Sequence, residues 1–220
     1  MASSIKEIED IINQRIGPVF NRNGFKLRKK DNTYVGDRNN QREEFQISIK
    51  NANNHFNIHL ILSVYNESIG NLRASVKKLM PATRHSISLS AAMKAQIEKN
   101  NSLIASLTDW KPLDPMGNLH IWFEAFDNLE EVENLDEQLQ TAVNLGISWF
   151  KLCTDSDFII QSNIERGLEP SLETALLFIH LNKNESLDTI FKKIVSDRLS
   201  KKLNTSSIEA FYNALKTLEG

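Results

Sequence analysis

Two long runs of alternating residues constrain the fold more than any other feature of this chain. The first, EEFQISIK, places Phe45, Ile47 and Ile49 on one face, and the second, HFNIHLILSVY, repeats the pattern with Phe56 and four aliphatic residues. A period of two is typical of a half-buried β-strand. Because only the turn-forming sequence NANN separates the runs, we predict a long antiparallel hairpin with one buried face.

Shorter alternating segments predict that the hairpin belongs to a larger sheet. Phe25 and Leu27 alternate with Lys26 and Arg28, and TYVGD follows after a turn. Later in the chain NLHIWFEAF, residues 118–126, alternates again. We therefore predict an antiparallel sheet of about five strands.

The N-terminal segment has the period of a helix. Its isoleucines form one stripe over residues 4–22, and Ser4 followed by Glu7 is a capping-box pattern. Pro18 is expected to kink or interrupt this helix because it lacks a backbone donor. Gly24 suits the left-handed position that follows a helix.

Other helical segments complete an α+β fold. Helical spacing predicts helices over residues 69–80, 91–107 and 129–150, and the pattern stays helical from about residue 156 to the end. We expect an α+β domain over residues 1–155 and a helical C-terminal extension packed on it over residues 156–220.

Composition excludes several classes of protein. The 220 residues are 40% hydrophobic and 25% charged, which is ordinary for a globular chain. The single cysteine cannot form an internal disulfide. No apolar run approaches the ~20 residues that span a bilayer, and the N-terminus lacks the apolar core of a signal peptide. We therefore expect a cytoplasmic protein that does not bind a membrane.

The second half of the chain is acidic. The first 100 residues hold 16 Lys and Arg against 9 Asp and Glu, whereas the rest holds 10 against 19. Seven acidic residues lie between Glu124 and Glu137, and Glu130, Glu133 and Glu137 are expected to share one helical face. These three are candidates for binding a basic partner protein. Their alternative role is structural, since acidic residues near a helix N-terminus complement its dipole; a catalytic role has the least support.

The first half has a basic segment with two interpretations. Alternation places Lys26, Arg28 and Lys30 on the face opposite Phe25. They can bind a polyanion such as a nucleic acid, with Tyr34 as the nearby exposed aromatic residue. We favour the other interpretation, in which lysines on an edge strand prevent unwanted strand pairing, and we do not expect a nucleic-acid partner.

No motif for catalysis, a cofactor or a metal is present. The chain lacks a phosphate-binding glycine loop, a dinucleotide fingerprint and a nucleophile elbow. Cys153 is expected to be a buried hydrophobic residue. His55 and His59 lie on a predicted strand, which separates their Cα atoms by ~13 Å, so both cannot bind one zinc ion. We predict no catalytic, cofactor-binding or metal-binding residue.

Five segments in order resemble a bacterial family of uncharacterised proteins, the domain of unknown function 4304 type, over about residues 5–165. They are IGPVFNRNGFKLRKKDNTYVGDR, EEFQISIK, FNIHLILSVY, LHIWFEAF and GISWFKLCTDSDFI. The resemblance implies no catalytic residues. Proteins of similar appearance occur among bacterial immunity and toxin-associated genes, which implies partner binding by analogy.

These observations predict a non-enzymatic module that binds a partner protein, with an immunity-like protein as one form of it. Two alternatives stay open. One is a nucleic-acid-associated protein that uses the basic N-terminal half, and the other is an enzyme whose site is assembled only in three dimensions. The oligomeric state is open too, since Trp122 and Phe126 can lie at an interface or under a helix.

Overall fold

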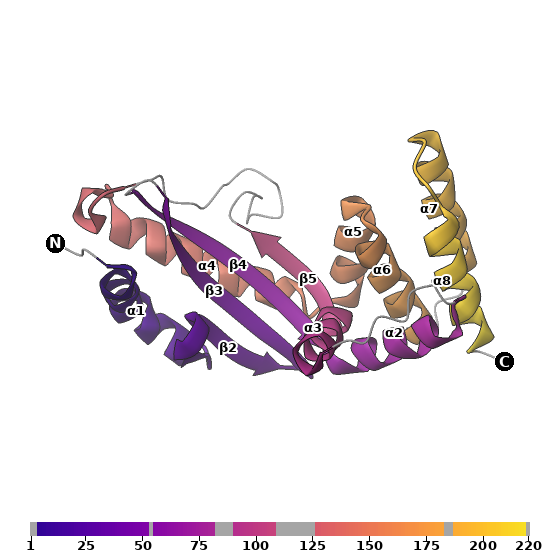
Figure 1. The fold of residues 1–220 in the computed structure, drawn as a ribbon, viewed down its shortest axis with the longest axis horizontal. Coiled ribbons are helices and arrows are strands. Elements are labelled where there is room, and N and C mark those ends of the chain that lie inside the picture. Colours follow the sequence, from indigo (N-terminus) through magenta and orange to yellow (C-terminus); the bar gives the residue numbers. More distant parts are fainter. Residues whose placement is uncertain (1–3, 53–54, 82–89, 109–125, 183–186, 219–220) are drawn as a thin grey trace. The chain divides into compact units, whose positions relative to one another are not determined.

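The computed structural model describes residues 4–52, 55–81, 90–108, 126–182 and 187–218. It contains a five-stranded antiparallel sheet in the order β1-β2-β3-β4-β5, with packed helices and a helical C-terminal part (Figure 1). The predicted α+β class is therefore confirmed. The strands are β1 (Lys26–Arg28), β2 (Thr33–Arg38), β3 (Gln41–Ala52), β4 (His55–Asn66) and β5 (Leu103–Thr108).

The chain forms two compact units. The first comprises Met1–Val64 and Ser106–Thr154, and the second comprises Tyr65–Ala105 and Asp155–Gly220. This grouping differs from the expected division at residue 155, in that residues 65–105 belong with the C-terminal helices.

Helix α1 (Ile5–Arg22) begins at the predicted capping box. The amide of Glu7 donates to Ser4 Oγ at 3.2 Å, and the amide of Ser4 donates to Glu7 Oε2 at 3.0 Å. The helix runs on through Pro18, so of the expected kink or interruption the interruption is wrong. Proline removes one hydrogen bond, and the remaining hydrogen bonds hold the last turn of the helix. Gly24 has the predicted positive φ of 83°, and the Phe25 amide then donates to the Phe20 carbonyl at 3.0 Å.

Phe45 of β3 joins the sheet to two helices in the first unit. Its ring centroid lies 4.9 Å from that of Phe20 in α1. Gly146 of α4 (Leu135–Leu152) lies against the same ring. Tyr34 is directly opposite Phe45 in the β2–β3 pair and stacks on Phe20 at 4.1 Å. The buried face predicted from the alternating runs is thus the face that α1 and α4 cover.

The helix predicted over residues 129–150 begins later than expected. Leu129–Glu131 form a short 3-10 turn, η2, and α4 starts only at Leu135. Between them Asn134 has a φ of 53°, a left-handed conformation that cannot continue a right-handed helix. Asparagine adopts this conformation more readily than most residues, which explains where the helix breaks.

The fifth strand that the structure describes, β5, lies outside the segment that was expected to form it. Residues 118–125 of that segment lie outside the described residues, and Phe126 forms only an isolated bridge with Phe56, by which it is buried. The interface position considered for Phe126 is therefore wrong, whereas Trp122 lies outside the described residues. A helix was expected over residues 91–107, but helix α3 (Ala91–Ser102) ends sooner, and the chain continues as β5. Asn100, Asn101 and Ser102 end α3 because these residues have low helix propensity.

Helix α6 lies at the centre of the second unit. Its residues 171–179 are all buried, as expected for a helix that neighbours surround. Helices α2, α5, α7 and α8 pack against it. The helices of this unit are α2 (Glu67–Leu79), α3, α5 (Ser156–Arg166), α6 (Glu169–Leu181), α7 (Leu187–Ser200) and α8 (Ser206–Thr217). Among the described residues, no helix has the length and apolar character needed to cross a membrane.

Candidate binding surface

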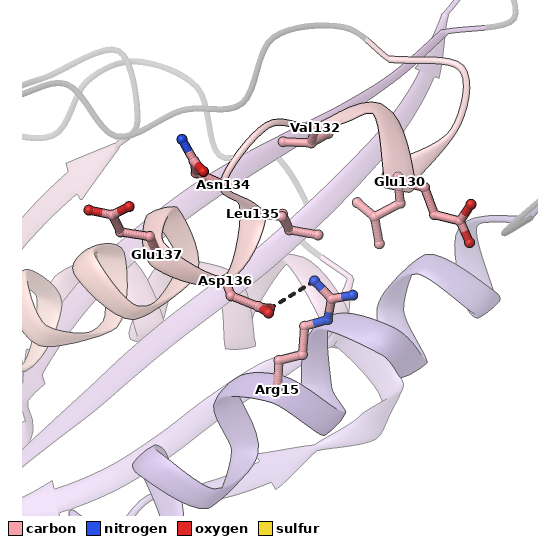
Figure 2. Close-up of a pocket in the computed structure, with 8 residues that line it drawn as sticks. Arg15, Glu130, Val132, Asn134, Leu135, Asp136 and Glu137 are labelled. Carbon is pink, nitrogen blue, oxygen red and sulfur yellow. Dashed lines mark hydrogen bonds and ion pairs between the residues drawn. The ribbon is translucent and has the colours of Figure 1, made fainter.

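A groove in the first unit brings α1 next to the start of α4 (Figure 2). Its volume is about 510 Å³, and it is open to solvent. Leu129 and Leu135, which are buried, form an apolar floor. The lining residues are Arg15, Leu129, Glu130, Val132, Asn134, Leu135, Asp136 and Glu137.

Local hydrogen bonds fix the backbone along one side of this groove. The amide of Glu130 donates to Asn128 Oδ1 at 3.3 Å, which starts the η2 turn. Gln138 Nε2 donates to the Glu133 carbonyl at 2.7 Å across the left-handed Asn134. The chain therefore reverses before α4 begins, and this reversal places the first turn of α4 beside η2.

Among the described residues that line the groove, one is a cation and three are carboxylates. Arg15 Nη1 donates to Asp136 Oδ1 at 2.8 Å. Glu130 and Glu137 point to different sides of this ion pair (Figure 2). The side chains of Arg15 and Asp136 are 39% and 80% exposed, and exposed ion pairs contribute only about 0–1 kcal/mol. The pair can therefore exchange for a cation from another molecule at little cost in stability.

The predicted acidic face is only partly correct. Glu130 lies in η2, Glu133 in the following loop and Glu137 in α4, so the three do not share a helical face; the break at Asn134 is the reason. All three are exposed, but only Glu130 and Glu137 line the groove. Glu124 lies outside the described residues.

Arg15 was not predicted as part of this site. It is 121 residues from Asp136 in sequence. No spacing rule links positions so far apart, so only the packing of α1 beside α4 brings them together.

The three basic residues that were candidates for binding a polyanion do not form one row on a strand. Lys26 is exposed on β1, but Lys30 lies in the 3-10 turn η1 (Lys29–Asp31), so the expected alternating row ends at Arg28. Arg28 binds Asp31 through Nε and Nη2, at 2.8 and 2.7 Å, and Glu44 Oε1 through Nη1 at 2.9 Å. The guanidinium lowers the pKa of Asp31 chiefly through these hydrogen bonds. Arg28 is therefore an internal ion-pair residue in this structure.

Tyr34 is not the exposed aromatic residue that polyanion binding would use. It is 1% exposed, and its hydroxyl donates to Asn13 Oδ1 at 2.8 Å. Burial raises the pKa of Tyr34 to about 12. The alternating pattern could not show this, because Tyr34 is covered by Phe20 of a different element.

Cys153, His55 and His59 are the remaining reactive side chains that were considered from the sequence. Cys153 is buried, as predicted, and burial raises the pKa of its thiol. His55 and His59 do lie on one strand, β4, and His120 falls outside the described residues. Over the described ranges, no group of three or more His, Cys, Asp or Glu could hold a metal ion.

Comparisons with protein-family models, with curated proteins and with solved structures found no match for this chain. The resemblance to the domain of unknown function 4304 type therefore stays a prediction.

Proposed function

We propose that this chain is a non-enzymatic binding module that takes up a basic segment of a partner protein in the groove between α1 and α4. The observation that carries the proposal is the composition of the groove: three carboxylates, Glu130, Asp136 and Glu137, line it together with buried leucines, and Arg15 is the single cation among the described lining residues. A segment with Lys or Arg beside an aliphatic residue matches both features. Charge complementarity of this kind favours fast and selective association.

Charge reversal in the groove tests the proposal. A tagged chain with Glu130→Lys and Glu137→Lys would be compared with the unchanged chain as bait in extracts of its native cells. We expect the unchanged chain to retain a basic protein that high salt releases, and the double variant to lose it. The matched control is Glu98→Lys, a reversal at an exposed position of α3. Equal retention by the groove variant would contradict the proposal.

An immunity-like role is a narrower form of the same proposal, supported only by the resemblance described above. In that form the basic partner is a toxin that this chain neutralises. The retained protein, expressed alone, should then arrest growth, and the unchanged chain should relieve the arrest. If the Glu130→Lys, Glu137→Lys variant also relieved the growth arrest, this would contradict the toxin-neutralising role and the groove as the site that binds the toxin.

The polyanion alternative has less support, because Arg28 is already bound by Asp31 and Glu44 and Tyr34 is buried. It predicts retention on immobilised nucleic acid that falls steeply with salt. The enzyme alternative predicts a deep cleft with converging polar groups. The groove of Figure 2 does not support it, since the groove is open and its glutamates point apart.

A further inference from the structure

A buried carboxyl group lies on the core face of β3 in the first unit. Glu43 is only 1% exposed, and it is paired in register with Gly36 of β2. Because Gly36 has no side chain, the ring of Phe25 packs there, and a Cβ atom at Gly36 would be 2.9 Å from this ring. Phe25 in turn contacts Phe150 near the end of α4, at a centroid distance of 5.6 Å. Phe25 therefore packs beside the β2 position opposite Glu43 and also contacts the last part of α4.

Some buried side-chain oxygen atoms in this part of β3 form no hydrogen bond with the described residues. Glu43 Oε1 and Gln41 Oε1 are both buried, and neither has a hydrogen-bond partner among them. Arg38 Nε lies 3.9 Å from Glu43 Oε1, a distance at which the two form a long ion pair without a hydrogen bond. A charged carboxylate would be poorly compensated here, whereas an uncharged carboxyl group is tolerated.

The groups that face Glu43 come from three elements. Arg38 and Asp37 lie on β2, where Arg38 lowers and Asp37 raises the pKa of the Glu43 carboxyl group. Gln41 lies on β3 itself. Cys153, the residue that ends α4, is fully buried and close enough for the Glu43 charge to oppose thiolate formation. Burial is the main cause that raises the pKa of Glu43; Arg38 opposes the rise and Asp37 adds to it.

We propose that Glu43 is a pH-sensitive latch: the end of the β2–β3 hairpin stays closed near the end of α4 while this buried carboxyl group is uncharged, and its ionisation opens this region and exposes Cys153. The closed form binds the proton more tightly than the open form. The closed form is therefore fully stabilised below pH 4.5, the ordinary pKa of the group, and this stabilisation is lost as the pH rises through the raised pKa.

The only cysteine of the chain reports directly on this opening. The full-length protein would be reacted with 4,4′-dithiodipyridine, an uncharged disulfide, from pH 4.5 to pH 8. Each rate would be divided by the rate of the denatured chain at the same pH, which removes the intrinsic ionisation of the thiol. We expect the protection of Cys153 to fall by up to about tenfold per pH unit until the raised pKa is passed, and then to level off.

Substitutions of Glu43 separate the latch from other causes of opening. In Glu43→Gln the protection should not change with pH, whereas the control Glu98→Gln, at an exposed site in α3, should retain the fall. Glu43→Met replaces the glutamine variant if the latter does not fold. Asp37→Asn, at an exposed position, should move the levelling-off to lower pH because it removes a charge that raises the pKa of Glu43.

Three results would overturn the proposal. The first is a protection that stays constant over this pH range in the unchanged chain. The second is a fall of the same size in a folded Glu43 variant. The third is an Asp37→Asn curve that coincides with that of the unchanged chain. Any of them would mean that the ionisation of Glu43 does not control access to Cys153.

Discussion

Gly146 of α4 lies so close to the ring of Phe45 in β3 that a Cβ atom at this position would be 2.7 Å from Phe45 Cε2. The same added atom would be 3.2 Å from a methyl group of Leu62 in β4. The ring of Phe45 also contacts Phe20 of α1, which limits its freedom to move away. The absence of a side chain at Gly146 thus sets how closely α4 approaches the sheet.

Replacing Gly146 by alanine should therefore destabilise the protein. Overpacking a core costs about 1–3 kcal/mol, whereas the better helix propensity of alanine returns about 1 kcal/mol. We expect a net loss of up to about 2 kcal/mol in the free energy of unfolding, measured by urea denaturation. Ser148→Ala, on the exposed side of α4, is the control and should change it by less than about 0.5 kcal/mol. A Gly146→Ala variant as stable as this control would show that the sheet and helix can separate slightly.

Arg73 of α2 is a buried charge of the second unit. Its side chain is 3% exposed and donates to the Asn101 carbonyl and to Thr174 Oγ1. Its Nε lies 3.5 Å from Glu173 Oε2, a distance at which the two form an ion pair without a hydrogen bond. Burial lowers the pKa of Arg73, and Glu173 partly offsets this effect. The residue therefore connects α2 to α6 and to the end of α3.

Arg73→Ala should lower the free energy of unfolding by about 3–5 kcal/mol, since it leaves Glu173 and the carbonyl groups buried with fewer partners. Combining Arg73→Met with Glu173→Met should restore much of this loss, because an apolar pair often replaces a buried ion pair without penalty. Urea denaturation monitored by circular dichroism measures both. Lys78→Ala, at an exposed site of α2, is the control. If the double variant is no more stable than Arg73→Ala, hydrogen bonds to the carbonyl groups are the larger contribution.

The strands and the first helix could be predicted because their signals are local. The alternation around Phe45 sets which face of β3 is buried, and Ser4 with Glu7 marks the start of α1 within four residues. The strand β5 could not be predicted from its own residues. LIASLT is short and apolar, and such a segment is compatible with either a helix or a strand until its neighbours are known.

The site depends on contacts that no local pattern contains. The acidic composition around Glu130 and Glu137 was visible in the sequence, but the break at Asn134 was not recognised, although asparagine is among the residues that tolerate a positive φ. The burial of Glu43 was missed for a different reason. Charged residues are seldom buried, so alternation with Phe45 was not enough to place Glu43 on the core face.

Tyr34 should stabilise the contact between β2 and α1. Tyr34→Phe removes its hydrogen bond to Asn13 Oδ1, and we expect a loss of about 0.5–1.5 kcal/mol at pH 7. Because the pKa of Tyr34 is raised to about 12, its uncharged form stabilises the fold below pH 10, and this contribution is lost as the pH rises through 12. The unchanged chain should therefore lose up to roughly 2–3 kcal/mol between pH 10 and pH 12 that Tyr34→Phe does not lose. Parallel losses in both proteins would mean that Tyr34 is not the group responsible.

Arg15 should compete with the partner for the groove. Its guanidinium occupies Asp136, the same kind of carboxylate that we propose a basic segment binds. Arg15→Gln should therefore tighten binding of the retained partner, by up to about five-fold at low salt, because an exposed ion pair contributes about 0.2–1 kcal/mol. Asp136→Asn should weaken it. Isothermal titration calorimetry at 50 and 300 mM salt measures both changes, and the difference between the variants should shrink at the higher salt. Weaker binding by Arg15→Gln would instead assign Arg15 to direct contact with an acidic group of the partner.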